Sequence, residues 1–158
     1  MRAGFIRVGV ISDTHGLLRP EAVTALRGVD HILHAGDIGN MQILDTVRAL
    51  APVTAIRGNI DRIGPCAKLP AAEFIELGGH ALYMLHDLAT LDLNPSDAGI
   101  AAVISGHSHK PAIEIRKSVL YFNPGSAGPR RFTLPVSIGI LEIGATGITP
   151  QLIELSVN

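Results

Sequence analysis

The sequence predicts a layered α/β protein in which two packed β-sheets, forming a two-sheet β-sandwich, are flanked by helices. The first half alternates strand-like and helix-like segments, which is typical of parallel strands joined by right-handed crossovers. The second half is a series of short strand-like segments, several of them separated by turn residues. Because these segments outnumber the strands of one modest sheet, we expect two sheets packed face to face.

Three strands and two helices are expected in the first half. The β-branched run at residues 5–12 predicts the first strand, and residues 31–35 and 53–57 predict the next two. Helices are expected at residues 20–27, where a proline stands in the first turn, and at 41–50, where apolar residues recur at helical spacing.

A hairpin opens the second half, because Gly78-Gly79 stands between the strand-like segments 74–77 and 81–85. A short helix is expected within residues 92–99. The strands that follow are expected to pair mostly in antiparallel fashion. They comprise residues 101–105, 112–116, 119–122, 136–142 and 148–155.

Length and composition predict one globular domain over residues 1–158, with a core of aliphatic side chains because only 4% of residues are aromatic. The net charge of −1 argues against stable nucleic-acid binding and against attraction to an anionic membrane. High mean hydropathy favours an apolar patch covered in a homo-oligomer. A single cysteine, Cys66, excludes an internal disulfide; with no signal-peptide or membrane-spanning pattern, we expect a cytoplasmic protein.

Polar residues typical of metal sites follow several of the expected strands. Asp13 and His15 follow the first strand, and Asp37 follows the second. His107 and His109 repeat the two-residue spacing of Asp13 and His15 in a later loop. Because functional groups collect at the carboxyl ends of strands in α/β sheets, these loops can converge. The remaining candidates are Asn59 and Asp61 after the third strand and His86 after the hairpin.

Carboxylate and imidazole groups without a thiolate suit Mn, Fe, Zn or Co better than a purely hard Mg²⁺ or Ca²⁺ site. Each motif alone has a plainer explanation: Asp13 could cap a helix, Asn59 could serve a turn, and His86 could be a buried histidine. Five such signals in consistent order favour a shared metal site. Outside this set, His31 and His80 are expected to be structural or surface residues, Cys66 inert, and His34 either buried or a partner of a ligand.

In sequence order, these motifs resemble those of the calcineurin-like metallophosphoesterase superfamily. They read Asp13-Thr14-His15-Gly16, Gly36-Asp37, Gly58-Asn59-Ile60-Asp61, His86 and Gly106-His107-Ser108-His109. The chain length and the segment Asn123-Pro124-Gly125-Ser126 further resemble its small prokaryotic one-domain phosphodiesterase branch. The resemblance implies a two-sheet sandwich with a dinuclear metal centre. By motif, Asp13, His15 and His109 would bind the first ion, Asn59, His86 and His107 the second, and Asp37 both.

The resemblance also implies an activity, namely hydrolysis of a phosphodiester by in-line attack of a metal-bridging hydroxide. Manganese is the first choice for both divalent ions, with Fe, Zn, Ni or Co as alternatives. Asp37, Asn59, Asp61 and His107 form the expected catalytic set, in which Asp61 orients a ligand. Candidate substrate contacts are Asn59, Asn123, Ser126, Arg130 and Arg131; a plain tight turn and a solvated arginine pair are the alternatives.

Two departures from the family pattern concern substrate scope. Ile60 stands where many members have a histidine that serves as leaving-group acid, and Asp87-Leu88 replaces the common Gly-His after His86. The expected partner is a small phosphoester, without a membrane or nucleic acid. Phosphomonoesterase or nucleotide pyrophosphatase activity is the first alternative. A non-catalytic interaction scaffold is the second, since the family resembles a retromer subunit.

Overall fold

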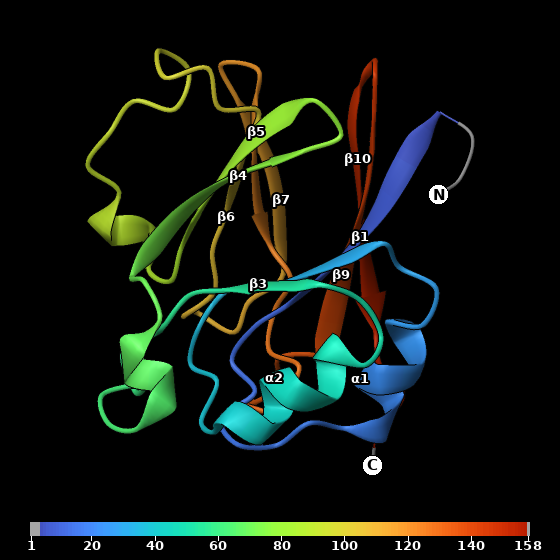
Figure 1. The fold of residues 1–158 in the computed structure, drawn as a ribbon, viewed down its shortest axis with the longest axis vertical. Coiled ribbons are helices and arrows are strands. Elements are labelled where there is room, and N and C mark those ends of the chain that lie inside the picture. The colour runs from blue at the N-terminus through green and yellow to red at the C-terminus, as the bar shows by residue number, and fades with distance from the viewer. Residues whose placement is uncertain (1–3, 158) are drawn as a thin grey trace.

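The computed structural model describes residues 4–157 and confirms two five-stranded sheets packed face to face, with few helices (Figure 1). The first sheet has the strand order β10-β9-β1-β2-β3. In it β1, β2 and β3 run parallel, as the alternating pattern of the first half predicts, and β9 pairs antiparallel with β1. Its strands are β1 (Phe5–Ile11), β2 (His31–His34), β3 (Val53–Ala55), β9 (Ser137–Gly144) and β10 (Gly147–Glu154).

The second sheet, ordered β4-β5-β6-β8-β7, is mixed, so the antiparallel pairing expected of most later strands does not extend to its centre. The hairpins β4–β5 and β7–β8 are antiparallel, but β5, β6 and β8 run parallel through the centre. The long connection over residues 86–101 returns the chain to the end where β5 began, and parallel pairing requires such a return. The strands are β4 (Ala72–Leu77), β5 (His80–Leu85), β6 (Ala102–Ile104), β7 (Ala112–Arg116) and β8 (Val119–Asn123).

Two α-helices, α1 (Pro20–Ala25) and α2 (Met41–Arg48), each end two residues before the predicted boundary. The short helix expected within residues 92–99 does not form. That segment makes a single turn between Asn94 and Gly99, whose φ of +74° ends it. Instead, two short 3₁₀ helices lie elsewhere: η1 (Pro65–Lys68), which buries Cys66, and η2 (Leu88–Thr90).

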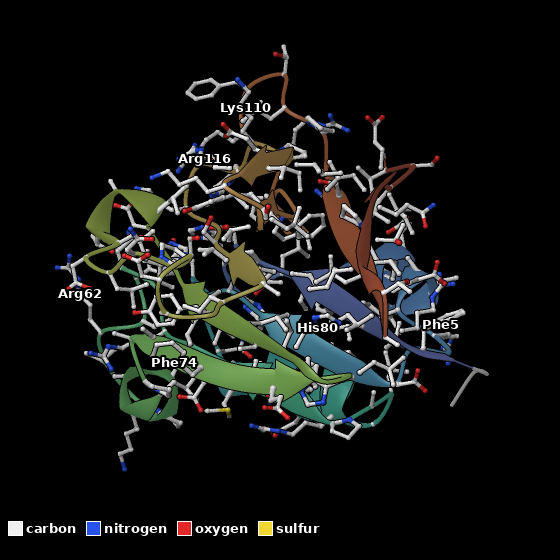
Figure 2. The ribbon with its side chains drawn as sticks, turned by 90° about the horizontal axis from the view of Figure 1, so that it is seen from above. Phe5, Arg62, Phe74, His80, Lys110 and Arg116 are labelled. Atoms are coloured by element: carbon white, nitrogen blue, oxygen red, sulfur yellow. The ribbon has the colours of Figure 1, made fainter. Side chains whose placement is uncertain are left out.

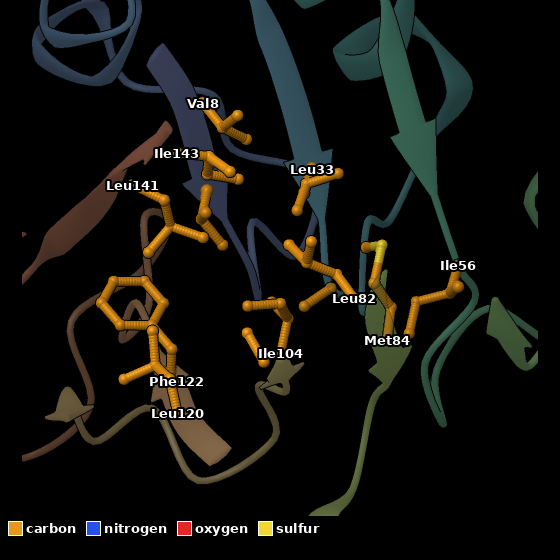
Figure 3. Close-up of a cluster of buried hydrophobic side chains, with 13 residues drawn as sticks. Val8, Leu33, Ile56, Leu82, Met84, Ile104, Leu120, Phe122, Leu141 and Ile143 are labelled. Carbon is orange, nitrogen blue, oxygen red and sulfur yellow. The ribbon is translucent and has the colours of Figure 1, made fainter. Parts of the chain in front are cut away.

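The core between the sheets is aliphatic, as the scarcity of aromatic residues predicts (Figure 3). Val8 and Leu33 from the first sheet meet Leu82 and Ile104 from the second, and Phe122 is the aromatic member of this cluster. Successive strand residues point to opposite faces, so the alternate residues pack outward against the helices. The outer cluster includes Ile11, Ile32 and Ile140 from strands and Ala22 and Leu26 from the α1 region.

The edges of the second sheet carry exposed apolar side chains. Figure 2 shows Phe74 on β4 and Arg116 on β7 at separate edges. Phe74, Ile113 and Ile115 are all exposed on these edge strands. Such side chains suit an oligomer contact, and the homo-oligomer stays a prediction. In the described part of the chain, no helix has the length and apolarity needed to span a membrane.

Candidate metal centre

The candidate site lies where parallel strands of both sheets end together. The loops after β1, β2 and β3 come from the first sheet, and those after β5, β6 and β8 come from the second. Backbone hydrogen bonds join the loops: the N–H groups of Asp13 and His15 donate to the carbonyls of Gly36 and Asp37, both at 2.9 Å. Gly106 N–H donates to the carbonyl of His86 at 3.0 Å, which joins two loops of the second sheet.

Two buried carboxylates stand at the centre of the site. Asp13 Oδ1 lies 3.4 Å from Nε2 of His109 and 3.7 Å from Nε2 of both His15 and His86. Asp37 Oδ2 lies 3.4 Å from His15 Nε2 and 3.3 Å from His86 Nε2. Asp37 therefore stands between two imidazoles that come from different sheets, which is the placement expected of a bridging ligand.

The chemistry of these groups fits divalent cations. Four buried side-chain atoms among the described residues have no hydrogen-bond partner: Asp13 Oδ1, His15 Nε2, His86 Nε2 and His109 Nδ1. A buried polar atom without a partner destabilises a fold by about 1–3 kcal/mol, so such a concentration indicates a missing ligand. Two sets of donors lie close enough to share an ion: Asp13 with His15 and His109, and Asp13 with Asp37 and His86.

Asn59 and His107 extend the second set toward solvent. Asn59 Oδ1 lies 3.1 Å from His107 Nδ1, and the rings of His86 and His107 are 5.2 Å apart at a steep angle. The rings of His15 and His109 are also 5.2 Å apart. The structure thus places His107 with Asn59 and His86, and His109 with His15 and Asp13, which is the partition that the motifs imply.

Backbone conformation is unusual at the site. Asp13, His15, Asp37, His107 and His109 all have positive φ, between 45° and 71°. Among the described residues, three other non-glycine residues share this property. Holding a non-glycine residue in the left-handed region costs about 1–3 kcal/mol, and such residues concentrate at functional sites. Here the loop-to-loop hydrogen bonds hold these conformations in place.

Close packing against the carboxylates requires glycine at two positions. A Cβ at Gly58 would collide with the backbone and carboxylate of Asp37, and a Cβ at Gly106 would collide with Ser12 Oγ and Asp13. Ser12 Oγ itself donates to Asp13 Oδ2 at 2.7 Å, which leaves Asp13 Oδ1 for the histidines. These glycines therefore allow the loops to approach the centre closely.

Asp61 belongs to neither set of donors close enough to share an ion, and it holds the loop that carries Asp37. Its buried carboxylate accepts the backbone N–H groups of Ile38 (3.1 and 3.2 Å), Gly39 (3.1 Å) and Gly58 (2.8 Å). All three donors flank Asp37 in space. Asp61 therefore acts on the site through the backbone.

A second buried brace, formed by Thr14 and His34, was given no definite role by the sequence. The Thr14 hydroxyl donates to the carbonyl of Ile38 at 2.8 Å and so accepts Nε2–H of His34 at 3.0 Å. His34 Nδ1 accepts the N–H of Gly36 at 3.1 Å. Burial lowers the pKa of His34 to about 4, which keeps the ring neutral and suits both contacts.

Electrostatics differ among the ligands. The contact with the Asp13 carboxylate raises the pKa of His15. Burial lowers the pKa of His86, but the contacts with Asp37 and the Ala35 carbonyl outweigh burial, so this pKa is raised overall. Burial lowers the pKa of His109. Protons therefore compete with cations most strongly at His15 and His86.

For Asn123 and Ser126 the structure favours the alternative of a plain tight turn over a substrate contact. Asn123 Nδ2 donates to the Gly106 carbonyl at 2.9 Å, and its Oδ1 accepts Gly125 N–H at 2.9 Å. Ser126 Oγ donates to the Asp13 carbonyl at 3.0 Å. Both side chains are buried, and these contacts already use their polar atoms. They brace the loops that hold the ligands.

The two arginines of the later loop also differ. The positive charge of Arg131 lies near enough to His15 and His109 to oppose protonation of both, although the Asp13 carboxylate raises the pKa of His15 overall. Arg130 Nη1 instead donates to the Leu134 carbonyl at 3.2 Å, within its own loop. Arg131 is therefore the better placed of the two for a phosphate oxygen.

A hollow of about 270 Å³ opens beside Asn59, and we call it the Asn59 hollow. Arg57 lines it, a residue that sequence reasoning missed although it stands directly before Gly58-Asn59. Arg57 Nη1 also donates to the Leu69 carbonyl, which holds the guanidinium at the wall. The full lining is Arg57, Gly58, Asn59, Ala71, His86, Asp87, Thr90 and His107.

Solved structures with a similar fold include a phosphodiesterase, a predicted phosphoesterase and Vps29. An archaeal phosphodiesterase has a TM-score of 0.77 at 24% identity, with 94% of this chain and all of that chain covered. A predicted phosphoesterase from Streptococcus pneumoniae has a TM-score of 0.75 at 21% identity, covering 97% and 91%. Vps29 from Entamoeba histolytica complexed with Zn²⁺ has a TM-score of 0.72 at 22% identity, covering 94% and 99%. These likenesses show the fold.

Sequence comparisons identify the family. A probable metallophosphoesterase of Methanocaldococcus jannaschii is 37% identical over 136 residues, which cover 78% of this chain and 69% of that protein. One from Methanothermobacter thermautotrophicus is 35% identical over 159 residues, covering 93% and 91%. The model of the calcineurin-like phosphoesterase superfamily domain matches residues 6–146. With this match and the convergent ligands described above, the chain belongs to the calcineurin-like phosphoesterase superfamily of metal-dependent hydrolases.

Proposed function

We propose that this protein hydrolyses phosphodiesters with the help of two divalent metal ions, manganese being the first choice. The observation that carries the proposal is the convergence of carboxylate and imidazole groups from four loops, with four buried atoms that lack a partner. His15 and His109 would hold the first ion with Asp13. Asn59, His86 and His107 would hold the second, and Asp37 would contact both.

Two divalent cations, when bound, would stabilise the charge on the phosphoryl group as Lewis acids. They would also lower the pKa of a water, so that it can attack phosphorus as hydroxide at neutral pH. The chain's own residues would orient the ester. Arg131 offers a positive charge beside His15 and His109 that suits a phosphate oxygen. Ile60, exposed next to Asn59, has no proton to give to a leaving alkoxide.

The lining of the Asn59 hollow carries charges of both signs, the Asp87 carboxylate and the Arg57 guanidinium. A phosphomonoester carries about −1.5 to −2 charges at neutral pH, whereas a diester carries one, so both charges act more strongly on the monoester and their effects oppose each other. Support for a diester comes instead from an archaeal phosphodiesterase with a similar fold.

The test is turnover after metal removal and separate reconstitution with Mn²⁺, Fe²⁺, Zn²⁺, Ni²⁺ or Co²⁺. We expect no hydrolysis without metal, and faster hydrolysis of bis(4-nitrophenyl) phosphate than of 4-nitrophenyl phosphate with the preferred ion. Asp37→Asn serves as the inactive control. A preference for the monoester would replace the proposal with phosphomonoesterase activity.

An interaction scaffold is the second candidate, because Vps29 structures share the fold. Since one of them contains Zn²⁺, metal binding alone does not separate a scaffold from an enzyme. Turnover does. A protein that binds metal but hydrolyses none of the esters or nucleotide pyrophosphates offered would support the scaffold.

A further inference from the structure

Asp87 occupies a fixed position directly after the ligand His86. Its Oδ1 accepts the N–H of Ala89 at 3.0 Å and so caps η2. Its backbone carbonyl accepts the hydroxyl of Thr90 at 2.7 Å and the Thr90 N–H at 3.0 Å. These contacts hold the residue in place and leave the second carboxylate oxygen, Oδ2, for another partner.

That oxygen faces the imidazole of His107. Asp87 Oδ2 lies 3.8 Å from His107 Nε2, while Nδ1, the other ring nitrogen, lies 3.1 Å from Asn59 Oδ1. The neutral ring has one N–H. If the proton is on Nε2, this N–H points toward the Asp87 carboxylate, and the lone pair of Nδ1 lies beside Asn59 Oδ1. Nδ1 and Oδ1 are then two acceptors in contact, and a cation that both of them bind would satisfy this arrangement.

We propose that Asp87 is a positioning residue for the second metal ion. With the second ion bound, a small closing of the 3.8 Å separation would let Oδ2 accept Nε2–H of His107, which selects the ring tautomer and orientation that present Nδ1 to the ion next to Asn59. The inference rests on the proposed two-ion function. His107 needs such support because its side chain is 46% exposed. Carboxylate partners of ligating histidines typically change metal affinity by about 10–100-fold.

Asp87→Asn tests the proposal with little change in shape. The amide oxygen can still accept from Ala89 N–H, so the cap on η2 remains. The amide NH₂ then faces His107 Nε2, which favours the proton on Nδ1, where it opposes the ion. We expect the dissociation constant of the second ion to rise about 10–100-fold, with the first unchanged within about twofold. The matched control is Asp92→Asn, at an exposed aspartate in the same connection.

Two measurements on the full chain read out the effect. Calorimetric titration of Mn²⁺ into metal-stripped protein gives both affinities, and nitrogen-detected NMR of the metal-free protein gives the tautomer of His107. The NMR signal should move from Nε2–H in the original protein to Nδ1–H in the variant. In a His107→Ala background, Asp87→Asn should lower second-ion affinity no further.

The outcomes separate this inference from the function on which it rests. Binding of fewer than two ions by the unmodified protein would overturn the two-ion function itself. Two ions bound equally well by Asp87→Asn would overturn the role of Asp87 alone. An equally large loss in the His107→Ala background would also overturn it. Reduced turnover with unchanged metal affinity and tautomer would make Asp87 a proton donor or substrate contact instead.

Discussion

Removal of the Asp61 side chain should destabilise the protein strongly, although Asp61 is in neither set of donors close enough to share an ion. Asp61 is 4% exposed and satisfies three backbone N–H groups, those of Ile38, Gly39 and Gly58. In Asp61→Ala all three lose their partner, and each unsatisfied donor destabilises the fold by about 1–3 kcal/mol. Because water can enter the vacated space and serve some of these donors, we expect a total near the low end, about 3–5 kcal/mol.

Urea unfolding of the metal-free protein measures this difference directly. For a chain of this size, 1 kcal/mol lowers Tm by about 2–4 °C, so a fall in Tm of about 6–20 °C is also expected. The matched control is Asp45→Ala on α2, which removes an exposed aspartate paired with Arg48 and should change stability by less than about 1 kcal/mol. If Asp61→Ala were as stable as this control, the hydrogen bonds of Asp61 would not support the Asp37 loop, and our account of Asp61 would fail.

Further predictions concern the ligands, pH and the leaving group. Asp37→Asn should lose at least one ion and nearly all turnover, because less negative charge then separates two cations; normal metal stoichiometry by mass spectrometry would contradict bridging. His107→Ala and His109→Ala should each weaken a different ion while the metal-free fold stays intact by circular dichroism; a variant that keeps both affinities would refute the partition. Burial lowers the pKa of His34 from 6.5 to about 4. Between pH 4 and pH 6.5, His34 is therefore protonated in the unfolded chain and neutral in the folded protein. The free energy of unfolding should therefore lose up to about 3 kcal/mol from this group as pH falls from 6.5 to 4, and urea unfolding of His34→Gln should show a flatter pH dependence. With Ile60 beside the site, rates should depend steeply on leaving-group pKa, and Ile60→His should flatten that dependence, provided metal content is unchanged.

The sequence by itself determined most of the local structure. Periodicity and turn residues located the strands and both α-helices to within a few residues, and Gly78-Gly79, both with positive φ, marked the hairpin that β4 and β5 form. Ligand chemistry was also readable, since carboxylate and imidazole groups beside glycines have few other uses at strand ends. The family motifs made this pattern specific.

Tertiary structure alone decided strand partners and the roles of the bracing residues. An alternating pattern tells which face of a strand is buried but not which strand lies beside it, so the place of β9 next to β1 and of β6 between β5 and β8 was not foreseen. The roles of Ser126 and Asp61 depend on contacts with residues 113 and 23 positions away. Such contacts form only when the two sheets pack and bring separate strand ends together, because no local pattern encodes the distance between them.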